Sequence, residues 1–176
     1  TRVIAEGEVL QLSRVRDAST TEEVYMDVIR GKTAMLFEAS THSAAALAGS
    51  TEVQSEALRH FGDHLGIAFQ LVDDLLDYQG DAATLGKNVG DDLAEGKPTL
   101  PLIYTMREGT PEQAALVRKA IQKGGIEDLE AIRAAVEASG SLEYTAQLAR
   151  DYVARAITCL QALPASEYRD ALVELS

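Results

Sequence analysis

The sequence has little cysteine and an excess of acidic over basic side chains, and each feature narrows the class of protein. The one cysteine, Cys159, cannot form a disulfide within the chain and lies in an apolar helical pattern, so we expect a buried thiol in a reduced, cytoplasmic setting. The chain has 16 Lys and Arg against 28 Asp and Glu, a formal net charge of −12. Nucleic acid and anionic membrane surfaces attract basic faces, so neither is expected as a main partner.

Long apolar runs and strand-like patterns are also missing. No run approaches the roughly 20 apolar residues that a membrane-spanning helix needs, so stable membrane insertion is not expected. Apolar residues instead recur at spacings of three and four, which is typical of amphipathic helices. At 176 residues, 46% of them apolar, the chain is long enough for one domain with a core. The sequence therefore predicts a single all-α domain.

Helix-start signals divide the chain. A hydroxyl residue followed three places later by Glu or Gln is a capping box, and this pattern occurs at Thr20 with Glu23, Thr51 with Gln54 and Thr110 with Gln113. We expect helices at about 2–16, 22–48, 52–79, 98–108, 111–123, 127–138, 142–162 and 165–175. The glycine-rich stretch 80–98 is expected to be a loop with one helical turn. Both ends of the sequence lie inside helical patterns, so we expect further sequence on either side.

An acidic stripe runs along the expected helix 52–79. At 100° per residue, one arc of about 100° contains Asp63, Gly66, Gln70, Asp73, Asp74, Asp77 and Asp81. The other side chains from Leu65 to Tyr78 are apolar, which reverses the balance of an ordinary surface helix. We therefore expect a central helix whose polar stripe faces a wet cavity.

The crowded carboxylates of this stripe predict a bound cation. Unit charges about 4 Å apart repel by roughly 4 kcal/mol at an effective dielectric near 20, so Asp73, Asp74 and Asp77 need compensation. Oxygen ligands without a neighbouring His or Cys favour Mg²⁺ over zinc or iron. The alternative interpretation is a solvated acidic face.

Lys32 and Thr33 are candidate phosphate contacts. They follow Gly31, but a phosphate-binding P-loop needs a glycine where Met26 stands, so that motif is rejected. A lysine and a hydroxyl in an apolar segment suit a charged contact to phosphate with an added hydrogen bond, or else a lysine that extends to solvent.

The glycine-rich stretch contributes two further lysines, Lys87 and Lys97. Either could bind an anion near the end of the acidic helix, and either could be an ordinary surface charge. Asp91 and Asp92 could support such a site or cap the turn that follows them.

Together these motifs resemble the trans-prenyl diphosphate synthases, most closely the octaprenyl type that makes the side chain of ubiquinone. The resemblance covers nearly the whole chain and is carried by residues 6–11, 31–33, 69–77, 85–92 and 95–101. It implies a homodimeric helical bundle of the isoprenoid synthase type, here incomplete. Residues 1–176 would be the carboxyl-terminal part of one polyprenyl synthase domain, without the half that carries the first aspartate motif. The isolated chain is therefore expected to be inactive.

The same resemblance assigns roles to the candidate residues. The parent enzyme would condense an allylic prenyl diphosphate with isopentenyl diphosphate, using Mg²⁺, to a long-chain polyprenyl diphosphate. Asp73, Asp74 and Asp77 would be the metal-binding second aspartate motif, with Lys32 and Asp73 catalytic. Contacts to the allylic diphosphate would come from Lys32, Thr33, Gln70, Lys87 and Lys97. Glu6 and Gln11 would line the cavity.

Two other functions fit the same residues. A terpene cyclase uses the same aspartates and metal without isopentenyl diphosphate. A non-catalytic helical module, such as a dimer subunit that only binds a partner, would need neither substrate.

Overall fold

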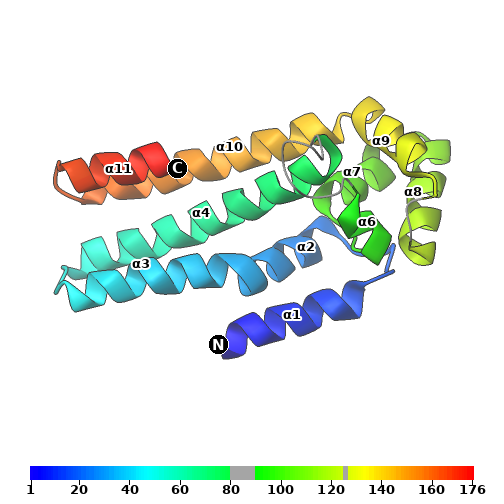
Figure 1. Ribbon diagram of the computed structural model, residues 1–176. Helices are drawn as coiled ribbons and strands as arrows, with labels where there is room; N and C mark the ends of the chain where they lie inside the picture. The colour runs from blue at the N-terminus through cyan, green and yellow to red at the C-terminus, as the bar shows by residue number, and fades with distance from the viewer. Residues whose placement is uncertain (80–89, 125–126) are drawn as a thin grey trace.

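The computed structural model describes residues 1–79, 90–124 and 127–176, and these residues form an all-α bundle without a strand (Figure 1). The elements are α1 (Arg2–Arg14), α2 (Glu22–Ile29), the π-helical segment η1 (Arg30–Ala34), α3 (Met35–Leu47), α4 (Glu52–Gln79), α6 (Asp91–Glu95), α7 (Leu100–Glu108), α8 (Pro111–Lys123), α9 (Leu129–Ala138), α10 (Ser141–Cys159), the 3-10 turn η2 (Leu160–Ala162) and α11 (Glu167–Leu175). The predicted all-α class is confirmed.

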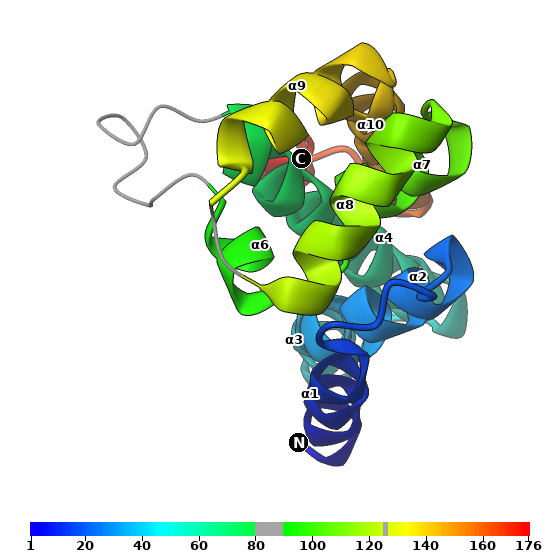
Figure 2. The ribbon, with the colours of Figure 1, turned by 90° about the vertical axis from the view of Figure 1, so that its right-hand side faces the viewer.

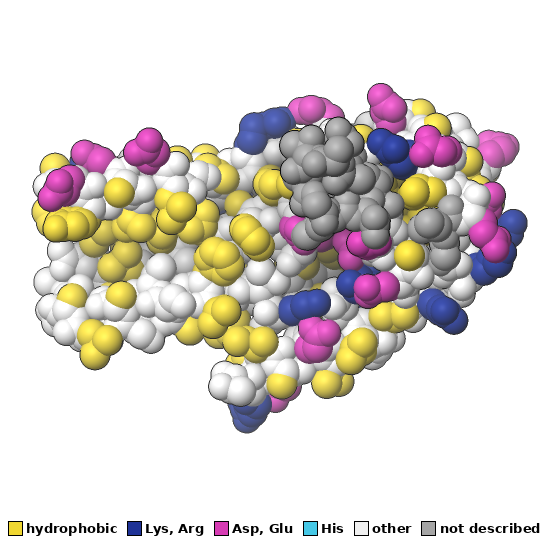
Figure 3. Space-filling view, in the orientation of Figure 1, with side chains coloured by type: hydrophobic (Ala, Val, Ile, Leu, Met, Phe, Trp, Pro, Cys, Tyr) yellow, Lys and Arg dark blue, Asp and Glu magenta, His cyan; other side chains and the backbone are white. Residues whose placement is uncertain are grey.

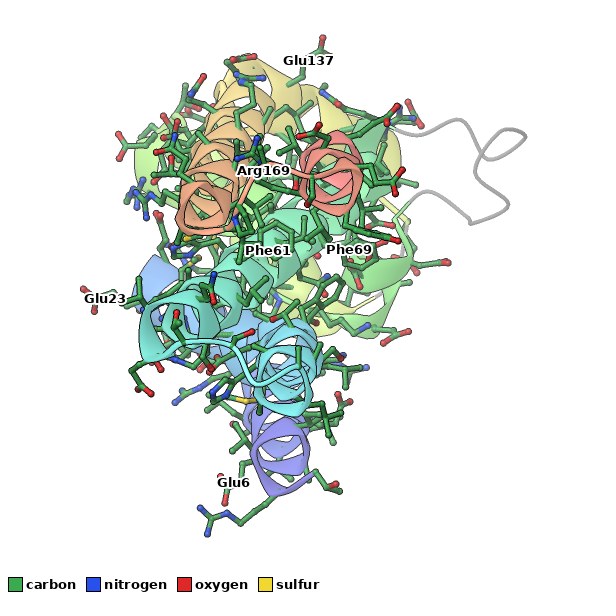
Figure 4. All side chains as sticks on the ribbon, turned by 90° about the vertical axis from the view of Figure 1, so that its left-hand side faces the viewer. Glu6, Glu23, Phe61, Phe69, Glu137 and Arg169 are labelled. Carbon is green, nitrogen blue, oxygen red and sulfur yellow. The ribbon has the colours of Figure 1, made fainter. Side chains whose placement is uncertain are left out.

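The long helix α4 packs between α3 and α10 (Figure 1). Ile67 and Leu71 of α4 are fully buried in a core cluster with Ile29, Leu100 and Ala149. At one end of the bundle, α7, α8 and α9 gather around a second core cluster (Figure 2). A third cluster, around the buried Phe61 seen in Figure 4, joins α4 to the end of α10 and includes the partly buried Cys159. No described helix is long and apolar enough to cross a membrane.

Two of the expected capping boxes are confirmed and one is wrong. Thr110 and Gln113 cap each other reciprocally at the start of α8, and Thr51 and Gln54 do so before α4. Before α2, however, the helix-capping residue is Thr21, whose hydroxyl accepts the amide of Val24 at 3.4 Å. Thr20 is buried and donates its hydroxyl to the carbonyl of Asp17 at 2.9 Å, so it is not available to cap the helix.

The expected helix 22–48 is continuous, but its middle is wound more widely than an α-helix. Around Gly31 the chain forms the π-helical segment η1 (Arg30–Ala34) and stays helical. Helix α1 crosses the chain here at very short range. A Cβ on Gly7 would lie 2.5 Å from the backbone nitrogen of Lys32, so only glycine permits this approach.

One apolar face of α4 is exposed, although the sequence predicted a central helix covered on its apolar sides. Phe69, Val72 and Leu76 are 56%, 42% and 37% exposed. Apolar side chains gather along this face over α3, α4 and α11 (Figure 3). The apolar side chains of α4 are therefore buried where the helix faces α3 and α10, and they are exposed to solvent on its remaining face.

Candidate functional site

Three residues of the predicted polar stripe, Gln70, Asp73 and Asp74, line a cavity of about 270 Å³. Its lining comes from α1, the connection to α2, α2 itself, η1, α4, α6 and the segment before α7. The lining residues are Gln11, Arg14, Thr20, Tyr25, Val28, Ile29, Lys32, Thr33, Gln70, Asp73, Asp74, Asp92, Lys97, Pro98 and Thr99. The structure thus brings together the candidates Lys32, Thr33, Gln70, Asp73, Asp74 and Lys97. Lys87, and Asp81 of the predicted stripe, lie outside the described residues.

A chain of hydrogen bonds connects η1, α4 and α2 beside the cavity. The hydroxyl of Thr33 donates to Gln70 Oε1 at 2.8 Å. Gln70 Nε2 donates to Asp74 Oδ1 at 2.8 Å, and the hydroxyl of Tyr25 donates to Asp74 Oδ2 at 2.6 Å. Both oxygens of Asp74 therefore already accept hydrogen bonds from the protein. Sequence reasoning gave Tyr25 no role, since a tyrosine in an apolar helical pattern carries no motif.

Burial dominates the electrostatics of Asp74. Asp74 is only 2% exposed. Burial, followed by the negative charge of Asp92, raises the pKa of Asp74 to about 7. Hydrogen bonds from Tyr25 and Gln70 act in the opposite direction. Burial, followed by the negative charge of Asp74, raises the pKa of Tyr25 well above its ordinary value, so the phenol keeps its proton.

Asp77 does not line the cavity. Its Oδ1 accepts the amides of Gly90 and Asp91 at 3.2 Å, and its Oδ2 accepts the amide of Asp92 at 3.4 Å. This carboxylate therefore caps the start of α6 and ties it to α4. Burial, then the charge of Asp92, raises the pKa of Asp77 to about 6.

Asp73 lines the cavity, and its Oδ2 lies 3.5 Å from Gln70 Nε2. Within residues 1–79, 90–124 and 127–176, no group of three His, Cys, Asp or Glu side chains is arranged to hold a metal ion. The donor chemistry still fits Mg²⁺, which takes one or two protein carboxylates and completes its shell with water and phosphate oxygens.

The lysines of the cavity are paired with carboxylates of their own neighbourhood. Lys97 Nζ lies 3.1 Å from Asp92 Oδ1 and 2.9 Å from Glu95 Oε2. Burial lowers the pKa of Lys97, but these two carboxylates outweigh burial and the pKa is raised. Lys97 is therefore a permanent cation at the cavity wall, and Asp92 is its partner.

Lys32 is held from α1. Its Nζ donates to Gln11 Oε1 and lies 3.2 Å from Glu8 Oε2. Gln11 lines the cavity as predicted, whereas the prediction for Glu6 is wrong. Glu6 points outward (Figure 4) and lies 3.5 Å from Arg2 in an exposed pair. Arg14, one helical turn beyond Gln11, is a further cation of the lining that sequence reasoning missed.

Comparison with known families decides the kind of protein to which this cavity belongs. The family model for polyprenyl synthetase matches residues 1–139. The chain belongs to the polyprenyl synthetase family. This member is 54% identical to the octaprenyl diphosphate synthase of Escherichia coli (strain K12) over 175 residues, which is 99% of this chain and 54% of that protein. It is 52% identical over 173 residues to the all-trans-nonaprenyl-diphosphate synthase (geranyl-diphosphate specific) of Rhodobacter capsulatus, covering 98% of this chain and 53% of the relative.

Solved structures of the family share the fold. The polyprenyl synthase from Caulobacter crescentus CB15, crystallised with calcium and isoprenyl diphosphate, matches with a TM-score of 0.93 and 46% identity. The match covers 99% of this chain and 54% of that one. The geranylgeranyl pyrophosphate synthase from Corynebacterium glutamicum, crystallised with isoprenyl diphosphate and magnesium, matches with a TM-score of 0.90 and 31% identity, over 98% of this chain and 50% of that one. This polyprenyl synthetase family member thus spans about half the length of the relatives it matches.

Proposed function

We propose that this chain is the carboxyl-terminal part of a polyprenyl diphosphate synthase, which joins an allylic prenyl diphosphate to isopentenyl diphosphate. The observation that carries the proposal is the cavity in which Lys32, Lys97, Gln70 and Asp73 meet from separate elements. A cavity with fixed cations, neutral donors and a carboxylate has the parts needed to hold a diphosphate together with a divalent ion. Octaprenyl diphosphate, for a ubiquinone side chain, is the product we propose from the resemblance and from the relatives' names.

In the proposed reaction the chain's residues stabilise the departing diphosphate. Negative charge builds up on that group as the allylic carbon–oxygen bond breaks, and Lys32 and Lys97, which both line the cavity, would offset it. The hydroxyl of Thr33 and the amide of Gln70 supply neutral hydrogen bonds. We propose Mg²⁺ as the cofactor, held by the second aspartate motif of Asp73, Asp74 and Asp77, in which Asp73 and Asp74 line the cavity and Asp77 would act from behind it. When bound, the metal would add positive charge at the leaving oxygens.

We also propose an oligomeric state and a cellular compartment for the parent enzyme. A homodimer is proposed from the resemblance, and a cytoplasmic setting from the single thiol of Cys159. Because the chain spans 54% of the Escherichia coli relative, we expect the isolated chain to bind diphosphate without turning it over.

A chimeric synthase tests the proposed reaction. In it, this chain replaces the 175 matched residues of the Escherichia coli octaprenyl diphosphate synthase. We expect Mg²⁺-dependent incorporation of labelled isopentenyl diphosphate into a prenyl product. Asp73→Ala and Lys32→Ala should each lower turnover by about 100-fold or more without lowering the melting temperature in proportion.

The control is Lys119→Ala, which removes an exposed lysine of α8, away from the cavity. Turnover that is unchanged in Asp73→Ala would refute the assignment. A cyclic product formed without isopentenyl diphosphate would indicate a cyclase, and a folded chimera without any turnover would favour a binding module.

A further inference from the structure

We propose that Tyr25 is a positioning residue of the diphosphate site, acting through Asp74 on Gln70 and Thr33. The inference rests on the proposed function, because it concerns the side chains that would meet diphosphate. Tyr25 itself is 4% exposed, and its hydroxyl already donates a hydrogen bond to Asp74. Tyr25 would therefore act on a ligand through its neighbours.

The direction of each hydrogen bond in this chain is determined by the group at its centre. The hydroxyl of Tyr25 donates to one oxygen of Asp74, and the NH₂ group of Gln70 donates to the other. With the NH₂ group of Gln70 turned toward Asp74, its carbonyl oxygen faces Thr33 and accepts the hydroxyl at 2.8 Å. The phenol of Tyr25 thus fixes Asp74, and Asp74 fixes which end of the Gln70 amide faces each neighbour.

Removing the phenol would loosen the side chains at the cavity wall. Asp74 Oδ2 would lose its 2.6 Å donor while the residue stays 2% exposed, so the carboxylate would have to turn toward another donor. Gln70 would then be free to reorient. That movement would carry Nε2 away from Asp73 Oδ2, 3.5 Å distant, and would release the hydroxyl of Thr33. The candidate metal ligand and the candidate phosphate contact would change together.

The test is calorimetric titration of the chain with inorganic pyrophosphate in the presence of Mg²⁺. Second-sphere partners of metal ligands are typically worth about 10–100-fold in affinity, so Tyr25→Phe should weaken pyrophosphate binding by about tenfold or more. The matched control is Tyr144→Phe. It removes a phenol that donates to a carboxylate at 2.7 Å, on Glu22, which does not line the cavity. Its pyrophosphate affinity should stay within about twofold of wild type.

Affinity, read beside the melting temperature, separates positioning from simple support of the fold. A support role would lower the fraction of folded protein and leave the affinity of the folded molecules unchanged, whereas positioning changes that affinity. Equal affinities of Tyr25→Phe and wild type overturn the inference and leave the proposed function standing. A wild-type chain that does not bind pyrophosphate overturns both.

If Tyr25→Phe does not fold, nuclear magnetic resonance of the wild-type chain provides the test. The two side-chain amide protons of Gln70 should stay distinct and protected from exchange when Mg²⁺ and pyrophosphate are added. Amide protons that become averaged and exchange freely on ligand addition overturn the inference, because the hydrogen-bond chain would then be absent when the ligand is held.

Discussion

Replacing Asp74 by asparagine should flatten the pH dependence of the chain's stability. Burial and the charge of Asp92 raise the pKa of Asp74 from its ordinary 3.8 to about 7 in the folded chain. The folded state therefore holds this proton more tightly than the unfolded state does. The resulting stabilisation is fully present below about pH 4 and is lost as the pH rises through about 7.

The magnitude follows from that pH window. Between pH 5 and pH 7 an unfolded chain has Asp74 ionised, while the folded chain holds the proton until it is half ionised near pH 7. The free energy of unfolding then falls by up to about 1.4 kcal/mol per pH unit, or roughly 2 kcal/mol over the window. The side chain of the Asp74→Asn variant carries no charge at any pH, so the variant should lack this fall.

Urea unfolding at pH 5 and pH 7.5, followed by circular dichroism without Mg²⁺, measures the effect. All other carboxylates titrate in both proteins, so the difference between the two pH slopes isolates Asp74. Asp151→Asn, on the exposed side of α10, is the control and should keep the wild-type slope. Parallel curves for wild type and Asp74→Asn would show that Asp74 is ionised in the folded chain throughout, and would refute the reasoning.

Three more substitutions test separate parts of the structure. Gly7→Ala places a Cβ 2.5 Å from the backbone nitrogen of Lys32, so α1 must shift; thermal melting should show a loss of about 1–3 kcal/mol, with weaker pyrophosphate binding, and a neutral result would contradict the close crossing. Lys97→Ala should weaken pyrophosphate binding by about tenfold and reduce its dependence on salt, as titrations at two ionic strengths would show. Thr110→Ala removes the capping box with Gln113 and should cost about 1 kcal/mol in urea unfolding, with pyrophosphate affinity unchanged; a change in affinity would mean that α8 influences the cavity.

The helices were predictable because their periodicity is local and strong. The expected helix 52–79 coincides with α4, and 111–123 coincides with α8, where capping signals and apolar spacing agree. The helix-capping residue before α2 was not predictable, since Thr20 and Thr21 are both hydroxyl residues. Only the extended backbone of Thr21 and the burial of Thr20 distinguish them, and both depend on how the segment packs.

The sequence predicted which residues gather at the site, but not which contacts each of them makes. A helical wheel places Asp73, Asp74 and Asp77 on one arc, but it cannot show that α6 brings three amides back to Asp77. Nor can it show that a phenol from α2 reaches Asp74. Each of these contacts joins residues far apart in sequence, so the path of the chain decides them.

The pairing of the cavity lysines explains why an acidic chain would need a divalent ion to hold diphosphate. Lys97 is already bound to Asp92 and Glu95, and Lys32 to Gln11 and Glu8. Under the proposed function, a diphosphate would have to compete with protein carboxylates for each lysine while it approaches Asp73. Divalent cations that arrive with the diphosphate would remove that conflict, since they offer charge that no side chain has yet neutralised. Asp73 would then serve as a ligand where it would otherwise repel the substrate, and each lysine would exchange one anionic partner for another.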